Sequence, residues 1–356
     1  MYMQAVVASF AGVCLYWVLC QFFSKRYSAV FSILIFSDYL ILNWHSIVLT
    51  ESLSISLLTI SVFLKMQLAV TNKRITLSRA TGLNVFLDIC LCLVKPTFFF
   101  FSLGVYMYLI LRKRVAGDLE ISFARLLSLF CISCIFSLMG MGKYFYDTGD
   151  VGFSDLQKYA KVGQLISIGA LKSNPCINKA CSHRTKAYVM SYEKLDFSPS
   201  PFAVANEVSR KHPQWTKVDV LKHVIEDLGK NQSVKLWAKR FRNISSMMSG
   251  RSYYQTESVF YELFFYRTFY EVVRRVSKLL GLPVLIFALY TVVVGIYRQD
   301  IEISSIILGL AFLYLTFVTA FANYIEWGRM IAPALPSLHA YMLVCLTGLR
   351  RSWIKK

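Results

Sequence analysis

The chain has 356 residues, of which 56% are hydrophobic and 15% aromatic, and its formal net charge is +19 at pH 7. The apolar residues come in runs of about 20 with few charges, a pattern that excludes an ordinary water-soluble domain and predicts membrane-spanning helices. Much of the positive charge lies in short loops between these runs, where it sets membrane orientation. We therefore do not interpret it as a sign of nucleic-acid binding.

Nine apolar runs follow one another along the chain, and we expect each to form one membrane crossing. The first run is too long for the apolar part of a signal peptide and lacks the basic residues that precede one, so it is expected to stay in the protein. The sequence thus predicts an all-α polytopic membrane protein with about nine transmembrane helices. The runs cover residues 3–23, 30–49, 52–70, 84–94, 97–111, 121–142, 279–297, 303–325 and 330–349.

Between the sixth and seventh runs lies a long polar segment with scattered aromatic residues. Apolar positions recur there at three and four residues, for example in 202–208 and 218–225, which predicts short amphipathic helices. We expect three parts: residues 1–142, an N-terminal bundle of six transmembrane helices; residues 143–278, a mainly helical extracytoplasmic domain; and residues 279–356, three C-terminal helices with a basic cytoplasmic tail.

The short basic loops alternate with the other turns, which predicts that all of them face the cytoplasm. These loops are 24–27, 72–79, 112–114, the turn at Arg298 and the C-terminus. The opposite face then receives the remaining turns and the polar segment, because long loops cross the membrane regardless of their charge.

Lys95 lies between two apolar runs and is followed by Pro96. Proline cannot continue a helix without the loss of a backbone hydrogen bond, so we expect the helix to break at this pair. The lysine then sits at a membrane face. Two interpretations stay open: an interfacial anchor whose ammonium reaches water, or a ligand for an anionic group.

Other ionisable residues are predicted at helix ends on the same outer face. Such a set suits an anionic lipid head group, because lysine supplies a point charge and arginine a bidentate fork for phosphate. Simpler interpretations are also open: Thr50 and Glu51 as a helix cap, or Glu326 and Arg329 as a helical ion pair. The full set is Glu51, Lys95, Lys143, Glu326 and Arg329.

Three stretches resemble the GT-C superfamily of glycosyltransferases, in particular its protein O-mannosyltransferase and aminoarabinose transferase branch. Leu49-Thr50-Glu51-Ser52-Leu53 is similar to that family's Thr-Glu turn, and Leu93-Val94-Lys95-Pro96-Thr97 to its lysine-bearing helix end. Glu326-Trp327-Gly328-Arg329, followed by Pro333 and Pro336, is similar to its late Glu-x-x-Arg pattern. The order of helices agrees across roughly residues 1–140 and 279–350.

The resemblance implies a transferase that moves a sugar from a polyprenyl-phosphate carrier to a glycan, lipid or protein acceptor at the outer face, with inversion. It gives the carrier phosphate to Lys95 and Arg329, and positioning of cations or sugar to Glu51 and Glu326. It also implies a carboxylate base and a bacterial inner (plasma) membrane location, with the donor as the lipid substrate and no further cofactor identified.

One departure concerns the family's first helix and its acidic outer loop. No Asp or Glu precedes Asp38, so the catalytic residue is not identified and we expect an N-terminally shortened chain. Two alternatives carry no chemistry: a transporter or flippase, and a degenerate relative that only binds the lipid carrier. A flippase is expected to place polar residues through the depth of the membrane.

The cysteines, the charges within apolar runs and the tryptophans of the polar segment allow further expectations. Cys176 and Cys181 lie five residues apart in the polar segment, where a small-loop disulfide is plausible in an oxidising compartment. No His and Cys set has zinc spacing. We expect Lys65 and Arg125 to snorkel from helix ends, and Asp88 to pair inside the bundle. Trp215 and Trp237 are interpreted as packing residues, with contact to the membrane surface or to sugars as alternatives.

Overall fold

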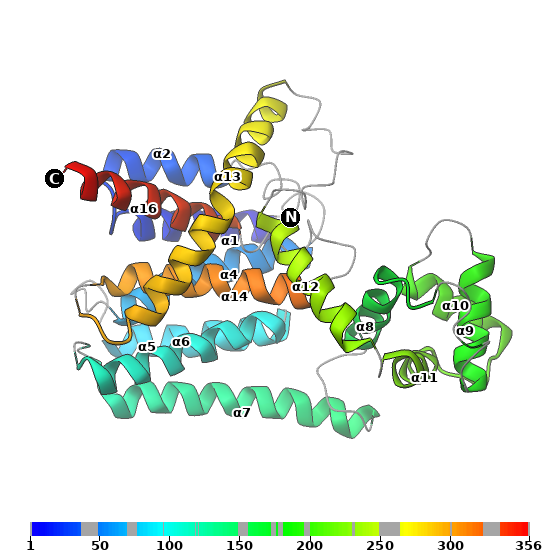
Figure 1. The fold of residues 1–356 in the computed structure, drawn as a ribbon. Coiled ribbons are helices and arrows are strands. Elements are labelled where there is room, and N and C mark those ends of the chain that lie inside the picture. The colour runs from blue at the N-terminus through cyan, green and yellow to red at the C-terminus, as the bar shows by residue number, and fades with distance from the viewer. Residues whose placement is uncertain are drawn as a thin grey trace. The chain divides into compact units, whose positions relative to one another are not determined.

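A computed structural model describes residues 2–36, 49–69, 77–94, 96–117, 119, 121–148, 156–171, 176, 181–195, 200–229, 232–248, 264–299, 301–322 and 335–354. Within these ranges every regular element is an α-helix, so the predicted all-α class is confirmed (Figure 1). The helices before the polar segment are α1 (Tyr2–Leu19), α2 (Lys25–Phe36), α4 (Leu49–Ala69), α5 (Leu77–Val94), α6 (Pro96–Val115) and α7 (Phe123–Thr148).

The later helices fall into two sets. The polar segment forms α8 (Leu156–Ser167), α9 (His183–Lys194), α10 (Pro201–Lys211), α11 (Lys217–Gly229) and α12 (Ser233–Met248). The C-terminal part forms α13 (Phe264–Val294), α14 (Ile303–Ala322) and α16 (Leu335–Ile354). Helix α13 passes through Lys278 without a break, although the sequence predicts a boundary there.

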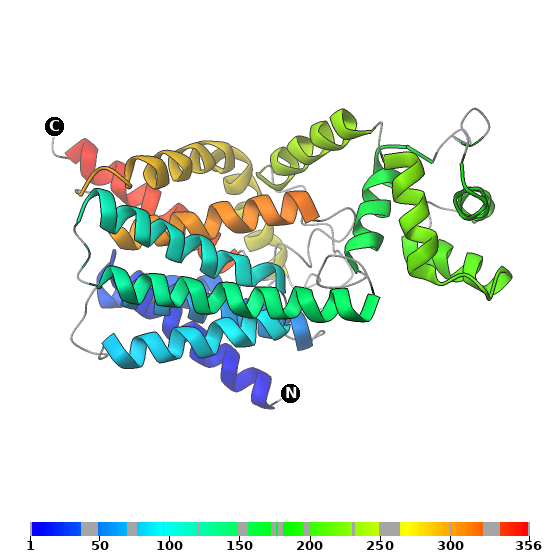
Figure 2. The same ribbon diagram turned by 90° about the horizontal axis from the view of Figure 1, so that it is seen from below.

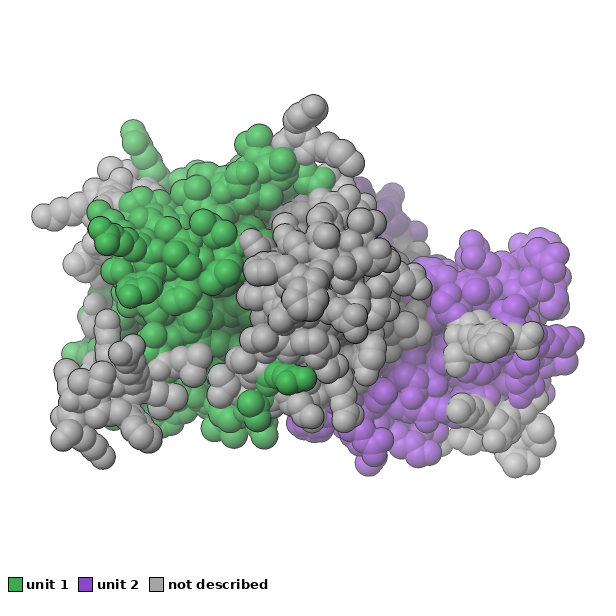
Figure 3. Space-filling model, turned by 90° about the horizontal axis from the view of Figure 1, so that it is seen from above, with its two compact units in different colours: residues 1–140, 245–319, 327–356 green, residues 141–244, 320–326 purple. Residues whose placement is uncertain are grey.

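Contacts divide the chain into two compact units, which Figure 3 colours separately. Unit 1 comprises residues 1–140, 245–319 and 327–356, and unit 2 comprises residues 141–244 and 320–326. The predicted extracytoplasmic position of residues 143–278 concerns a membrane, and it stays a prediction.

Helix α4 forms the centre of unit 1. It packs against α1, α5, α6 and α16. Almost every described side chain between Leu53 and Ala69 is buried, on all faces of the helix. A helix with no exposed face is a core element, and this position explains why residues 52–70 show an apolar run without an amphipathic stripe.

Side-chain contacts show how the helices of unit 1 run. Asn84 of α5 donates to the carbonyl of Leu64 in α4, and Asp88, one turn later in α5, contacts Lys65, whose ammonium reaches back to Ser61; α5 is therefore antiparallel to α4. The rings of Phe101 and Tyr314 lie 5.9 Å apart, while the Arg112 guanidinium donates to the carbonyl of Ile301 at 3.1 Å. Helices α6 and α14 are therefore antiparallel. Figures 1 and 2 show most helices of this unit along a common direction.

One described helix is long and apolar enough to cross a membrane, over Phe123–Asp147 in α7. Shorter apolar stretches occur in four other described helices, over 4–19, 53–69, 281–294 and 303–318. The nine predicted crossings are thus not established within the described ranges, and they stay a prediction.

Unit 1 distributes its side chains in an unusual way. Large apolar residues point outward on several helices, such as Ile135 and Leu138 on α7, and Leu279 and Leu282 on α13. The interior is mostly apolar, but it also contains polar residues, including Ser54, Ser56, Thr59, Ser61, Lys65, Asn84, Asp88, Ser102, Ser133, Thr291, Ser304 and Thr316. Water-soluble proteins rarely expose extended apolar surfaces of this kind.

Unit 2 has an apolar core of its own. The core consists of Tyr159, Val162, Leu165, Leu171, Tyr188, Val189, Val204, Ala205, Val208, Val220, Leu221, Val224 and Leu228, all of which lie on its helices except Leu171, which follows α8. The predicted short amphipathic helices at 202–208 and 218–225 are confirmed as parts of α10 and α11.

Helix ends in unit 2 carry recognisable caps. The hydroxyl of Ser182 accepts from the N–H of Thr185 at the start of α9, and that of Ser200 from Ala203 ahead of α10. After α8, Gly169 adopts a φ of 74°, and the N–H of Ala170 donates to the carbonyl of Leu165. Glycine takes this left-handed conformation without a steric penalty, so it ends the helix cleanly.

Candidate functional site

The predicted helix break at Lys95-Pro96 is confirmed by the helix bounds. Helix α5 ends at Val94 and α6 begins at Pro96. Proline is tolerated at the first position of a helix, because the N–H that it lacks has no partner within the helix there. Lys95 itself lies outside the described residues, so the direction of its ammonium stays a prediction.

Glu51 belongs to the first turn of α4, which begins at Leu49. The Thr50-Glu51 pair therefore opens this helix rather than forming a separate turn. The helix dipole favours an acid at this position, but Thr50 lies inside the helix and is not the N-cap that the sequence suggested. The Glu51 side chain is outside the described part of the structure, and whether it also contacts a ligand stays a prediction.

Glu326 and Arg329 lie outside the described residues, between the end of α14 at Ala322 and the start of α16 at Leu335. Their predicted ion pair and the predicted approach of Arg329 to Lys95 stay predictions. Lys143 is described: it is exposed on the last turns of α7.

The helix ends next to Glu51, Lys95 and Glu326 nevertheless lie at one end of unit 1. Because α4 and α6 are both antiparallel to α5, the start of α4 at Leu49 and the start of α6 at Pro96 lie at the same end of the bundle. Helix α14 is antiparallel to α6, so it runs toward that end. The C-terminal ends of α5 and α14 lie at this end too and offset the dipoles of the two N-termini, so attraction of an anion here would rest on the free N–H groups of α4 and α6 and on cationic side chains.

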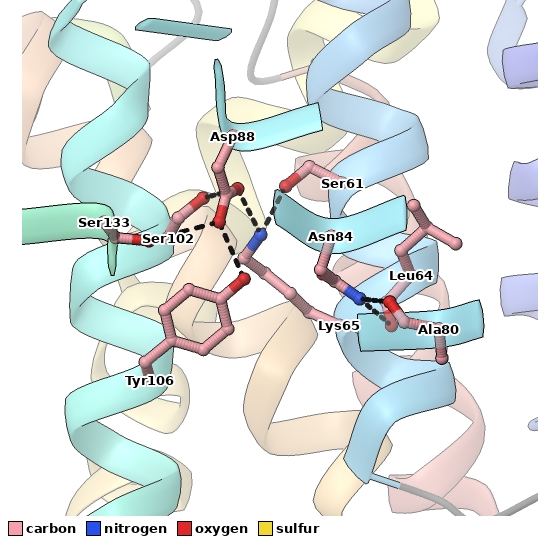
Figure 4. Close-up of polar contacts among 9 residues, drawn as sticks. All are labelled: Ser61, Leu64, Lys65, Ala80, Asn84, Asp88, Ser102, Tyr106 and Ser133. Carbon is pink, nitrogen blue, oxygen red and sulfur yellow. Dashed lines mark hydrogen bonds and ion pairs between the residues drawn. The ribbon is translucent and has the colours of Figure 1, made fainter. Parts of the chain in front are cut away.

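A second group of polar residues lies in the interior of unit 1, and we call it the Lys65–Asp88 cluster (Figure 4). It consists of Ser61 and Lys65 of α4, Asp88 of α5, Ser102 and Tyr106 of α6, and Ser133 of α7. The ammonium of Lys65 lies 2.9 Å from Oδ1 of Asp88, and the two side chains are 0% and 3% exposed.

Every polar atom at the centre of this cluster has a partner. Ser102 donates to Oδ1 of Asp88 at 2.5 Å, and Tyr106 donates to Oδ2 at 2.7 Å. Lys65 also donates to the hydroxyl of Ser61 at 2.9 Å, and its ammonium lies 5.1 Å from the centre of the Tyr106 ring. Ser133 adds a longer contact of 3.5 Å to Oδ2 of Asp88. A buried ion pair is tolerated only with this degree of hydrogen bonding.

The expectation that Lys65 snorkels from a helix end is wrong. Its ammonium turns inward to Asp88, because the charges neutralise each other in a place that water does not reach. Asp88 pairs inside the bundle as expected, with a lysine 23 residues earlier. The sequence does contain a sign of this pair, because two opposite charges lie in neighbouring apolar runs. The position of Lys65 near the end of its run instead suggested that its ammonium points outward to water.

Two other polar side chains are anchored within unit 1. Asn84 donates to the carbonyls of Leu64 and Ala80, at 3.2 and 2.8 Å. Arg112, expected in a basic cytoplasmic loop, is 1% exposed and donates to the carbonyl of Ile301. One cation of the predicted 112–114 loop thus serves packing between α6 and the start of α14.

Unit 2 contains polar contacts of its own. The structure joins Cys176 and Cys181 in a disulfide, with their Cα atoms 5.5 Å apart. The N–H and the hydroxyl of Ser182 both donate to Oδ2 of Asp227, at 2.9 and 2.8 Å. Burial raises the pKa of Asp227, but hydrogen bonds from Thr185 and Ser182 outweigh it, so the net pKa is lowered.

The tryptophans of unit 2 behave differently from each other. Trp215 packs against the apolar core and stacks on the ring of His212, which fits a packing role. Trp237 is half exposed on α12. Within the described residues, no three His, Cys, Asp or Glu side chains converge as a metal site would require.

Comparison of the chain with family models, with curated proteins and with solved structures found no match.

Proposed function

We propose that the chain is an integral membrane protein that binds a polyprenyl-phosphate carrier at one end of unit 1 and transfers its sugar to an acceptor. The observation that carries the proposal is the break between α5 and α6 at Lys95-Pro96, at the same end of the bundle as the start of α4 with Glu51. A lysine at the junction of two helices is suited to a lipid-linked phosphate, because its ammonium makes charge-assisted hydrogen bonds to phosphate oxygens.

The membrane part of the proposal has separate support. The outward faces of unit 1 carry large apolar side chains, while a charged cluster lies inside. In a bilayer the outward residues meet lipid tails, and intramembrane charges face the interior and pair with one another. The last turn of α6 is basic, and it lies beside the residues that precede α14. A basic end of the bundle suits the cytoplasmic face of a membrane.

In the proposed reaction, the acceptor oxygen attacks the anomeric carbon while the bond to the carrier phosphate breaks. A base removes the proton of the acceptor, and the phosphate leaves with the electron pair of the broken bond. Lys95 and Arg329 balance the negative charge on that phosphate, and Glu51 and Glu326 position these cations or the sugar.

A transporter is the second candidate, and one observation favours it. The Lys65–Asp88 cluster places charges in the interior of the bundle, whereas the sequence suggested that polar groups gather mainly at one face. Ionisable residues inside a membrane often mark a substrate path. The cluster is sealed and its ion pair fully hydrogen-bonded, however, so it fits helix packing better than a path.

The first test is binding of undecaprenyl phosphate to the full chain in nanodiscs. Lys95→Ala should weaken binding roughly tenfold or more, the loss of a charge-assisted contact. Lys25→Ala is the matched control: this lysine is exposed at the start of α2, and its loss should leave affinity unchanged. Equal affinities for all three proteins would remove Lys95 from the site.

The second test follows radiolabelled sugar from a polyprenyl-phosphate donor. Transfer to an acceptor that Lys95→Ala abolishes would support the enzyme. Carrier binding without any transfer would favour the non-catalytic lipid-binding protein. Movement of a labelled lipid across the bilayer of proteoliposomes, without loss of its sugar, would favour the transporter.

A further inference from the structure

Helix α12 carries an exposed apolar stripe on a basic helix. Val234, Trp237 and Phe241 are 80%, 48% and 61% exposed. They are three and four residues apart, so they share one face of the helix, together with exposed Ala238. Large apolar residues in a continuous exposed row mark a surface that meets something other than water.

Cations border this stripe on both sides. By helix geometry, Lys235 and Arg242 flank one side of it, and both are exposed. Arg240 flanks the other side: its guanidinium lies 5.2 Å from the Trp237 ring centre and donates to Oε1 of Gln164 at 3.4 Å. Helix α12 also contains Lys239, and its sequence includes no Asp or Glu.

The remaining face of α12 fixes the helix to its own unit. Leu236 packs against the core of unit 2. Ile244, seven residues after Trp237 and on the same side of the helix, is buried, so the exposed stripe ends before it. Other helices of this unit pair their cations: Arg210 and Lys211 both contact Glu207 on α10. Helix α12 has no acid of its own with which to do so, which leaves its face positive.

We propose that α12 lies on the surface of an anionic bilayer, with Trp237 and Phe241 at the boundary between head groups and acyl chains. Tryptophan prefers this boundary, because its ring is apolar and its N–H polar. The bordering cations meet lipid phosphates, which explains a basic helix with an apolar stripe. This role is separate from sugar transfer and needs neither Lys95 nor Arg329.

The test uses the full chain with its seven free cysteines replaced and the Cys176–Cys181 disulfide kept. Ala238→Cys places an environment-sensitive fluorophore on the stripe and leaves Trp237 and Phe241 intact. Met190→Cys, on α9 of the same unit and 54% exposed, is the matched control. Both proteins are placed in phosphatidylcholine nanodiscs with or without phosphatidylglycerol, and nitroxide-labelled lipid head groups serve as the quencher.

We expect the lipid nitroxide to quench position 238 strongly in the anionic nanodiscs, and position 190 little. Lys235→Glu with Arg242→Glu should abolish the difference, and removal of phosphatidylglycerol should reduce it in the unchanged helix. The second comparison needs no charge variant, so it holds if that variant misfolds. Equal quenching at the two positions, or quenching that is insensitive to lipid charge, would overturn the proposal.

Insertion into nanodiscs reports separately on the membrane proposal for unit 1. If the chain does not enter nanodiscs, that proposal fails. The labelled proteins are then mixed with vesicles of the same two compositions, where the same contrast between positions 238 and 190 is expected. A lack of contrast there would overturn the role of α12 by itself.

Discussion

The two units of this chain both have apolar cores, but they differ in the charged groups that lie inside them. Unit 1 keeps a lysine and an aspartate in its interior and turns large apolar side chains outward. Unit 2 buries valine, leucine and tyrosine and turns its charged residues outward. The exposed apolar residues and the internal ion pair of unit 1 suit a lipid surrounding, in line with the proposed membrane location.

Different contacts fix the arrangement of the helices in the two units. In unit 2, close packing of apolar side chains from four helices defines the core, and caps end the helices. In unit 1, one carboxylate receives hydrogen bonds from three other helices and thereby fixes their register. Each interior can be tested by a substitution that removes its own characteristic contact: a charge in unit 1 and an apolar side chain in unit 2.

The largest effect is expected from Lys65→Met. It leaves Asp88 buried without its cation and should lower the free energy of unfolding by about 3–5 kcal/mol. Denaturation of the full chain in detergent, followed by helix content, measures this. Lys25→Met at an exposed site should stay within about 0.5 kcal/mol of the wild type.

The paired substitution Lys65→Met with Asp88→Leu sharpens this result. It removes both charges, so it should cost less than Lys65→Met alone. A single variant as stable as the wild type would mean that the ion pair does not hold unit 1 together.

The next effect is expected from Leu221→Ala in the core of unit 2. This side chain is fully buried, and its truncation should cost about 2–5 kcal/mol. Hydrogen exchange of the α9 and α11 amides in the full chain measures the stability of this unit. Leu138→Ala is the matched control in unit 1: Leu138 is 65% exposed, so a cost within about 0.5 kcal/mol is expected. Similar costs at both sites would break the comparison.

The smallest effect is expected from low pH, which should reduce the stability of unit 2 through Asp227. The folded pKa of Asp227 is lowered, with burial opposed by hydrogen bonds from Thr185 and Ser182. A lowered pKa stabilises the folded state above the unfolded pKa, which is about 3.9, and that contribution is lost as pH falls through the folded value. The melting temperature of unit 2 should therefore drop below about pH 4.

Asp227→Asn isolates this contribution, because the amide does not carry the charge. The variant should melt at a lower temperature than the wild type at pH 7, and the gap should shrink as the pH falls below about 4. A gap that stays constant over this range would show that the charge of Asp227 contributes nothing to the stability of unit 2.

Local patterns alone determined much of the helical organisation. Apolar periodicity predicted α10 and α11, and the rigid ring of Pro96 marked the break between α5 and α6. The spacing of Cys176 and Cys181 suggested the bond that the structure shows. These features depend on neighbours in sequence, so they are visible without a fold.

Tertiary structure decided how distant residues meet. Lys65 and Asp88 are 23 residues apart, and only the antiparallel packing of α4 and α5 turned a supposed surface lysine into a buried partner. Packing likewise buried Arg112 and left Trp237 exposed while Trp215 was covered. A side chain's direction depends on the free energy of every neighbour it can reach, and sequence order does not specify those neighbours.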